Sequence, residues 1–324
     1  NAGDGTDALQ LTVASNVTSA TVGAKVTNFE SVYGYASASD TSLIVAQDVS
    51  KLGSTITTVG TNKWARSHGS TNGGNDYTAT DGVNFSNLAA GTNLALSGIS
   101  ATGLDANDGA IVNFTATADL KTDTTADSID VTLGTATAAY ATTDTGTNTA
   151  VNTTLALADY ETINIKSQGG DQTIASLTST DVSKLVITGD KKLTLSAFTT
   201  SKLATIDASG ATKVVMGAKA SDKATTITGA SSTSTYITGT KADNITGGAG
   251  NDTITAGTGN DTVTSGDGAD TINEVTGDDT VNAGAGDDTV LISDFSDLTS
   301  SDTIDGGDGT DTLKFAEDAA HNFT

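Results

Sequence analysis

The chain has 324 residues, enough for about two domains with a buried core. It contains no Cys, which excludes disulfides and thiolate metal sites. Its formal net charge of −24, from 39 acidic and 15 basic residues, excludes nucleic acid and anionic membrane surfaces as partners, because both require Lys and Arg.

The composition predicts an all-β chain. Thr, Ala, Gly, Ser, Asp and Asn dominate, aromatic residues make up only 4%, and Pro is absent. Thr, Val and Ile favour strands, whereas Gly, Asn and Asp favour turns. No stretch approaches 18 apolar residues, so we expect no transmembrane helix. No signal peptide is visible at Asn1, and the chain begins and ends within a pattern, so we expect a piece of a longer protein.

The first residues form a motif that returns near the other end. Gly3-Asp-Gly-Thr-Asp-Ala-Leu9 nearly repeats Gly307-Asp-Gly-Thr-Asp-Thr-Leu313. The following region, up to residue 160, is less regular. Short helical turns are expected at 48–52 and 85–89, and a loop at 142–152. Alternating apolar residues predict strands at 9–13, 43–45, 56–59, 111–114, 129–133 and 155–157.

A short segment of this region stands out by its residue types. It holds the only Trp and the only Arg, together with one of the two His: Trp64, Arg66 and His68. Trp and Arg are typical anchors of interfaces, so one hypothesis is a contact loop toward a neighbouring subunit or a glycan. The alternative is a partly buried Trp that fixes the loop.

Residues 161–237 suggest wide coils of a solenoid. Ile187, Ile206, Ile227 and Ile237 follow one another at steps of 19, 21 and 10, and a step of 8 leads to Ile245. This spacing predicts coils of about 20 residues that narrow to 18. Gly189-Asp190 and Ser209-Gly210 are turn signals between the predicted strands. A separate β-sandwich is the alternative.

From Thr238 the chain repeats every nine residues. Six units follow one another, Ile292–Ser296 is then an insertion, and a degenerate unit, Asp297–Asp305, precedes a last one from Gly306. Gly recurs at positions 2 and 4, Asp at position 6 and a large aliphatic residue at position 8. Asp occupies position 6 at Asp243, Asp252, Asp261, Asp270, Asp279, Asp288, Asp302 and Asp311.

This spacing predicts calcium sites. Gly allows tight turns with φ > 0, which direct backbone carbonyls inward, and Asp adds carboxylate oxygens; calcium requires six to eight such oxygens. Two units make one coil, so Asp252, Asp270 and Asp288 line one edge while Asp243, Asp261 and Asp279 line the other. In addition to the eight Asp residues at position 6, the predicted ligands are Gly247, Ala249, Asn251, Thr258, Asn260, Asp267, Ala269, Asp278, Ala285, Asp287, Gly306 and Asp308.

The charge distribution supports bound cations. Between Asp243 and Leu313 there are 15 Asp, one Glu and no Lys or Arg. Asp residues stacked about 4.8 Å apart would repel one another without cations. The alternative is an acidic, flexible linker, but a linker has no reason to keep aliphatic residues in nine-residue phase.

The nonapeptides resemble the repeats-in-toxin (RTX) family, whose motif is G-G-x-G-x-D-x-U-x with U a large aliphatic residue. The resemblance covers residues 238–315 and implies a parallel β-roll that binds multiple Ca²⁺ ions. By the same resemblance, Asp4 and Asp7 form a half-site at the tail of a preceding ladder.

The body resembles the surface-layer (S-layer) proteins of Gram-negative bacteria that carry these repeats. The resemblance covers about residues 120–324 and rests on the composition, Leu157-Ala-Asp-Tyr-Glu-Thr-Ile-Asn-Ile165, Leu203-Ala-Thr-Ile-Asp-Ala-Ser-Gly210 and Ile227-Thr-Gly. It implies type I secretion to the extracellular cell surface and a lattice of copies of the chain. It also implies attachment to a cell-surface polysaccharide through a region absent here, without membrane insertion.

The predicted fold is therefore an all-β chain, in which a parallel β-roll of RTX repeats joins a β-solenoid or β-sandwich-like body. The predicted division is a ladder tail at 1–13, a β-rich body at 14–160, a wide-coil solenoid at 161–237, the calcium roll at 238–315 and the start of a following segment at 316–324.

We expect a structural protein and not an enzyme. Neither an H-E-x-x-H helix nor a G-x-S-x-G elbow occurs, which disfavours a metalloprotease or a lipase. The sequence leaves a second hypothesis open, an RTX adhesin or toxin fragment whose ladder is a calcium-triggered folding and secretion module.

Overall fold

The structure is a computed structural model. It describes residues 8–11, 30–37, 44–52, 56–67, 78–96, 99–102, 111–120, 122–134, 150–217, 219–220 and 223–316. The chain divides into two compact units, Asn1–Val182 and Ser183–Thr324. This division is simpler than the five predicted segments, whose boundaries stay predictions.

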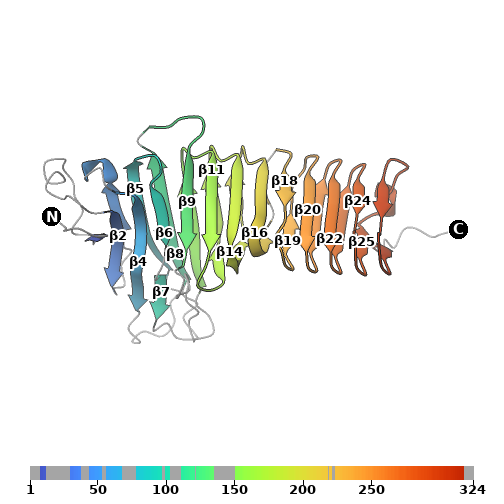
Figure 1. Ribbon diagram of the computed structural model, residues 1–324, viewed down its shortest axis with the longest axis horizontal. Coiled ribbons are helices and arrows are strands. Elements are labelled where there is room, and N and C mark those ends of the chain that lie inside the picture. Colours follow the sequence, from blue (N-terminus) through green and yellow to red (C-terminus); the bar gives the residue numbers. More distant parts are fainter. Residues whose placement is uncertain are drawn as a thin grey trace. The chain divides into compact units, whose positions relative to one another are not determined.

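The first unit consists of two parallel sheets, and the chain alternates between them (Figure 1). A 3₁₀ turn, η1, covers Val49–Lys51. One sheet contains β1 (Ala8–Leu11), β2 (Ser31–Ser37), β4 (Thr58–Ser67), β6 (Asn93–Leu96), β7 (Ile99–Thr102), β9 (Ser128–Leu133), β11 (Thr162–Ser167) and β12 (Gln172–Ile174). The other contains β3 (Ile44–Asp48), β5 (Thr78–Leu88), β8 (Ile111–Leu120), β10 (Ala150–Leu157) and β13 (Ser176–Ser179).

Stacked rows of apolar residues form the core of this unit. In the first sheet, Val32 pairs with Val59, then Leu94, Val131 and Ile165, and all five side chains are buried. In the second sheet, the paired residues Val83, Ala116, Leu155 and Leu177 form an equivalent buried row. Parallel pairing with alternation between two sheets is the geometry of a solenoid, whereas a β-sandwich is built from antiparallel sheets. The structure thus selects the solenoid.

One local prediction in this unit is wrong. The segment 85–89 was expected to be a helical turn, but β5 continues to Leu88. Asn87 has φ 55° and lies at a register shift between Phe85 and Leu88. This bulge turns Phe85 and Leu88 to the same buried side, although they are three residues apart. The bulge therefore gave two buried residues a spacing of three, which is typical of a helix and not of a regular strand.

The other local predictions have mixed outcomes. The helical turn at 48–52 is confirmed by η1, which Asp48 caps by accepting a hydrogen bond from the Ser50 N–H. The predicted loop at 142–152 is wrong at its end, because β10 begins at Ala150; residues 142–149 lie outside the described part. Strands β2, β5, β6 and β7 were not predicted: Gly and polar residues interrupt β2 and β5, and β6 and β7 are only four residues long.

The second unit is also a stack of parallel coils (Figure 1). It begins with two long strands and continues with short ones, and one 3₁₀ turn, η2 (Phe295–Asp297), lies near its end. The strands are β14 (Lys184–Leu195), β15 (Phe198–Thr200), β16 (Thr205–Met216), β17 (Lys219–Ala220), β18 (Thr226–Thr228), β19 (Thr235–Ile237), β20 (Asn244–Ala249), β21 (Thr253–Thr258), β22 (Thr262–Asp267), β23 (Thr271–Thr276), β24 (Thr280–Asn282), β25 (Thr289–Ile292), β26 (Thr303–Asp305) and β27 (Thr312–Phe315).

From β18 onward the strands form two facing series. The even-numbered strands, β18 to β26, pair with one another, and so do the odd-numbered strands, β19 to β27. The residues at position 8, which are aliphatic except for Tyr236, stack in each series. One row contains Ile227, Ile245, Val263, Val281 and Ile304, and the other contains Tyr236, Ile254, Ile272, Val290 and Leu313. All are buried except in the last coil, where Ile304 is half-buried and Leu313 is exposed. The parallel β-roll predicted from the nonapeptides is confirmed.

Three details of the wide coils differ from the predictions. Gly189-Asp190 and Ser209-Gly210 lie within β14 and β16, where the register shifts, so they mark irregularities inside strands and not strand ends. The residue that pairs with Ile206 is Leu185 and not Ile187. Tyr236, and not Ile237, continues the inner row, because Tyr236 is fully buried.

The insertion in the last coil is confirmed. Val281 pairs with Ile304 and Val290 with Leu313, so this coil is five residues longer than the coils before it. The extra residues lie beyond β25, where η2 forms, and Asp294 caps that turn by accepting a hydrogen bond from the Ser296 N–H. The two flanking strands keep their register because the insertion is absorbed in the turn.

Candidate metal centre

The residues at position 6 form two files along the roll. The first file consists of Ser234, Asp252, Asp270, Asp288 and Asp311, and the second of Thr225, Asp243, Asp261, Asp279 and Asp302. Each file lies at the start of one strand series, where a turn enters the next strand. The two predicted edges of stacked Asp residues are therefore present in the fold.

Within each file, one oxygen of each Asp carboxylate accepts a backbone N–H from the preceding coil. Asp270 Oδ1 accepts the N–H of Asp252 at 2.7 Å, and Asp288 Oδ1 accepts the N–H of Asp270 at 2.7 Å. In the second file, Asp261 Oδ1 accepts the N–H of Asp243 and Asp279 Oδ1 accepts that of Asp261, both at 2.7 Å. Each Asp thus fixes the backbone of the preceding coil, and the side chains have one defined orientation.

The second carboxylate oxygen has no such partner in four of these residues. The Oδ2 atoms of Asp252, Asp261, Asp270 and Asp288 are buried and accept no hydrogen bond from the described part of the chain. The four side chains belong to residues that are at most 2% exposed. A buried, unpaired carboxylate oxygen is costly, and a cation is the partner that it fits best.

Burial affects the protonation of these carboxyl groups. It raises the pKa of Asp252 to about 7, against the opposing effect of the Ser234 N–H, and the neighbouring Asp270 raises it further. Burial also raises the pKa of Asp261 to about 7 and shifts the pKa of Asp288 in the same direction. Without a cation, Asp252 and Asp261 therefore bind protons near neutral pH.

The turns that precede these Asp residues depend on glycine. Gly248, Gly257, Gly266 and Gly284, all at position 2, have φ between 93° and 120°, and a Cβ at any of them would lie 2.0–2.1 Å from a backbone oxygen of the preceding coil. Position 1 is also crowded: a Cβ on Gly247 would lie 2.9 Å from Asp252 Oδ2. The backbone therefore passes close to the unpaired oxygens, and the oxygen-rich surroundings fit a hard cation such as calcium.

Glycine substitution tests this close packing. Gly266→Ala is expected to destabilise the roll by on the order of 3–5 kcal/mol, through the left-handed backbone and the contact with Gly248. Gly91→Ala is the matched control, because Gly91 also has positive φ (80°) but its Cβ would meet nothing within 4 Å. A cost of about 1–2 kcal/mol is expected there. Urea unfolding followed by circular dichroism measures both, and equal losses would contradict the packing argument.

The predicted ligands at positions 3 and 5 also align from coil to coil. Ala249 pairs with Asp267, Asp267 with Ala285 and Ala285 with Asp308, while Thr258 pairs with Thr276. At position 5, side-chain oxygens accept N–H groups of the next coil: Asn251 from Ala269 at 3.0 Å, Asn260 from Asp278 at 3.3 Å and Asp287 from Thr310 at 2.9 Å. These exposed side chains brace the turns from outside.

The other predicted site residues lie either outside the described residues or in the first unit. Asp4, Asp7 and His68 lie outside the described residues, so the predicted N-terminal half-site stays a prediction. Trp64 and Arg66 lie in β4, in a strand and not in the expected loop, and their backbone pairs with Ile99 and Ala101 of β7.

Two members of the files were not predicted. Thr225 donates its N–H to Asp243 Oδ1 at 2.5 Å, and Ser234 donates its N–H to Asp252 Oδ1 at 2.7 Å. Both stand at position 6 of units whose inner residues are Ile227 and Tyr236. The nine-residue spacing from Ile227 through Tyr236 to Ile245 was the signal that could have revealed them.

A group of carboxylates in the first unit was not predicted either. Oxygens of Asp123, Asp127 and Glu161 lie within 4.8 Å of one another. However, Asp127 Oδ2 accepts the Thr124 N–H at 2.5 Å and Glu161 Oε2 accepts the Asp127 N–H at 2.7 Å. The carboxylates of Asp127 and Glu161 therefore lie close together because they accept backbone N–H groups and fix the local turn.

Comparison with known families gives a match over the roll. The sequence model of the RTX calcium-binding nonapeptide repeat matches residues 237–272, 276–291 and 294–317, with four copies. Residues 237–317 carry RTX calcium-binding nonapeptide repeats. The breaks in the match fall at Glu274-Val275, where position 2 lacks Gly, and at the insertion after β25. No curated protein and no solved structure matches the chain.

The RTX match indicates which cation the two files bind. RTX repeats bind calcium ions, and the buried Oδ2 atoms of the described roll fit that role. RTX repeats are also typical of secreted proteins. Among the residues that the structure describes, no helix has the length and apolar character needed to cross a membrane.

The raised pKa values predict how calcium binding depends on pH. Protonation of Asp252 and Asp261 stabilises the calcium-free roll; this contribution is full below the pKa of an unfolded Asp, 3.8, and is lost as the pH rises through about 7. Calcium displaces these protons, so its apparent affinity should fall below pH 7, by about tenfold per pH unit for each displaced proton. Calcium titrations between about pH 5.5 and pH 8 measure the effect, and an affinity constant over that range would contradict it.

Proposed function

We propose that this chain is a structural segment of a bacterial surface layer. In this proposal, calcium folds and staples the RTX roll, and copies of the chain form a two-dimensional lattice on the surface of a Gram-negative cell. The observation that carries the proposal is one face of the roll. All outward residues of the even-numbered series are exposed: Thr226, Thr228, Asn244, Thr246, Thr262, Thr264, Thr280, Asn282, Thr303 and Asp305.

This face has the chemistry of a self-complementary contact. Thr hydroxyls and Asn amides both donate and accept hydrogen bonds, so the same surface on two copies can pair. Parallel coils repeat about every 4.8 Å, so the hydroxyl groups form regular rows. A regular polar face on a calcium-dependent scaffold supports repeated contacts between copies better than it supports recognition of a single ligand.

The proposal includes no catalytic activity. The buried carboxylates of the roll would be the strongest candidates for acid or base chemistry. Asp252 and Asp261 each accept a backbone N–H through Oδ1, and their remaining oxygens are buried and accept no hydrogen bond from the described chain. Their place in the repeat assigns them to cation binding.

Electron microscopy and light scattering, with and without millimolar calcium, test the proposal. We expect ordered sheets or large oligomers with calcium and monomers without it. The pair Thr262→Lys and Thr264→Lys places positive charge on the outward face of β22 and should reduce assembly while calcium-dependent folding persists. Ser300→Lys, on an exposed turn outside this face, is the control.

One result would contradict the lattice itself and another the proposed contact face. One is a calcium-saturated chain that stays monomeric at high concentration, which would favour the adhesin or toxin module. The other is assembly that survives the two Lys substitutions on β22, which would remove the outward face of that strand from the contact.

A further inference from the structure

Two kinds of turn in the roll differ in the partners of the carboxylate at position 6. Four of these residues, Asp252, Asp261, Asp270 and Asp288, have a buried Oδ2 without a partner in the described chain. Asp302 is different. Its Oδ1 accepts the Asp279 N–H at 2.7 Å, as elsewhere in the files, but its Oδ2 accepts the Thr299 N–H of its own turn at 2.6 Å.

The glycine pattern explains the two kinds of turn. The turns with unpaired oxygens have Gly at both position 2 and position 4: Gly248 and Gly250, Gly257 and Gly259, Gly266 and Gly268, and Gly284 and Gly286. The turn that ends at Asp302 has Leu298 and Ser300 instead. With the left-handed conformations absent, this turn directs an N–H toward the carboxylate.

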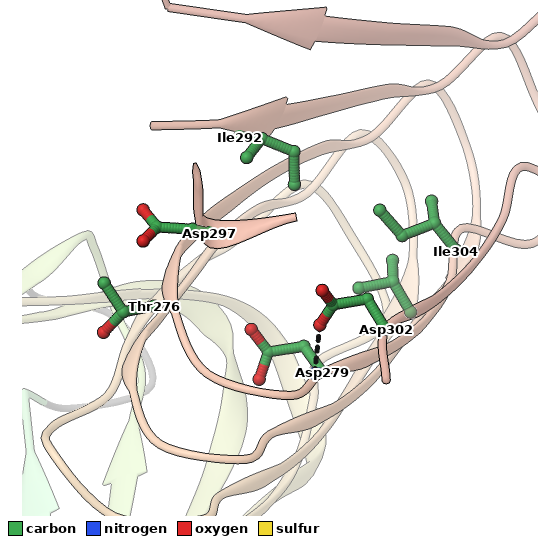
Figure 2. A pocket seen from close by; sticks show the side chains of 7 residues that line it. Thr276, Asp279, Ile292, Asp297, Asp302 and Ile304 are labelled. Atoms are coloured by element: carbon green, nitrogen blue, oxygen red, sulfur yellow. Dashed lines mark hydrogen bonds between the residues drawn. The ribbon is translucent and has the colours of Figure 1, made fainter. Parts of the chain in front are cut away.

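The surroundings of Asp302 also differ from those of a calcium site. Figure 2 shows a small cavity beside it, with Asp279, Asp297 and Asp302 on one side and Ile292 and Ile304 on the other. Its volume is about 10 Å³, close to the minimum that one water molecule needs. Three of its seven lining side chains, those of Val281, Ile292 and Ile304, are aliphatic. Both carboxylate oxygens of Asp302 already accept backbone N–H groups, so neither is left for a cation.

We infer that the turn ending at Asp302 closes without calcium, because the Thr299 N–H supplies the partial positive charge that the ion supplies elsewhere. Calcium is then distributed unequally between the two files. The first file has three consecutive unpaired oxygens, on Asp252, Asp270 and Asp288, whereas the second has one, on Asp261. The insertion thus ends the second file with a cap built from the protein itself.

The turn ending at Asp243 supports the same rule. It has Gly239 at position 2 but Lys241 at position 4, and Asp243 Oδ2 accepts the Gly239 N–H at 3.3 Å. Asp243 Oδ1 accepts the Thr225 N–H. The first and the last Asp of the second file, Asp243 and Asp302, therefore lie in turns without Gly at position 4, and each carboxylate accepts an N–H of its own turn.

Native mass spectrometry at saturating calcium tests this inference by counting bound ions in the whole chain. Asp302→Asn is expected to leave the number unchanged, and Asp270→Asn is expected to lower it by at least one. Leu298→Gly combined with Ser300→Gly is expected to raise it by one, because both glycines then release Asp302 Oδ2. Circular dichroism at saturating calcium identifies variants that still fold.

The outcomes are distinct. A loss of one ion in a folded Asp302→Asn variant would overturn the inference, and so would an unchanged number in the folded double-glycine variant. The inference rests on calcium binding by the roll and is independent of the proposed lattice. If the unaltered chain bound no calcium at all, calcium binding itself would fail, which is a different result from a wrong distribution of ions.

Discussion

Removal of calcium with EDTA at about pH 8 is expected to unfold the roll formed by β18 to β27, because its buried carboxylates would then be ionised and unpaired. Each unsatisfied buried polar group costs about 1–3 kcal/mol and a charged one more. Four such oxygens together approach the whole stability of a typical domain, about 5–15 kcal/mol. The calcium-free roll should therefore be unfolded at this pH and folded again when calcium returns.

Circular dichroism and hydrogen exchange measure this effect. We expect partial loss of the β signal and loss of amide protection in the roll, while protection persists in the first unit, whose inner rows, such as Val32, Val59 and Leu94, are aliphatic. Magnesium is the control ion, since it demands octahedral geometry and keeps its waters. A β signal and a melting temperature unchanged by EDTA would refute calcium-dependent folding.

Asp252→Asn is expected to have opposite effects on the two states of the roll. Asn preserves the shape and can still accept the Ser234 N–H, but its amide nitrogen cannot ligate a cation in place of Oδ2. We expect the calcium concentration for half-folding to rise at least about tenfold, since calcium affinity depends on the number of charged ligands. Without calcium, at about pH 8, the variant should be more stable than the unaltered chain, because a buried charge has been removed.

Calcium titration and urea unfolding in EDTA measure the two effects. Asp190→Asn is the matched control: its side chain is 71% exposed and pairs with Lys191 at 3.3 Å, outside the files. It should change neither quantity appreciably. If Asp252→Asn lowered stability equally with and without calcium, Asp252 would have a packing role and not a role in cation binding.

The two regions of the chain differ in how much could be predicted. In the roll, glycine, Asp and aliphatic residues have fixed positions in a nine-residue period, so strand positions, inward faces and the two files follow directly. In the first unit, coils differ in length. Ser31 pairs with Thr58, 27 residues on, whereas Thr58 pairs with Asn93, 35 residues on. No fixed period marks these strands, and β5 with its bulge at Asn87 was mistaken for a helical turn.

The sequence by itself determined the all-β class, the nine-residue unit, the position of each Asp and the identity of the cation, because these depend on residue types at fixed spacing. Only the tertiary structure decided which carboxylate oxygens remain unpaired. Asp302 and Asp270 occupy the same position in the repeat, yet a backbone N–H reaches Oδ2 of Asp302 and none from the described chain reaches Oδ2 of Asp270. The physical reason is that glycine at positions 2 and 4 sets the direction of the turn's N–H groups, and that direction exists only in the folded backbone.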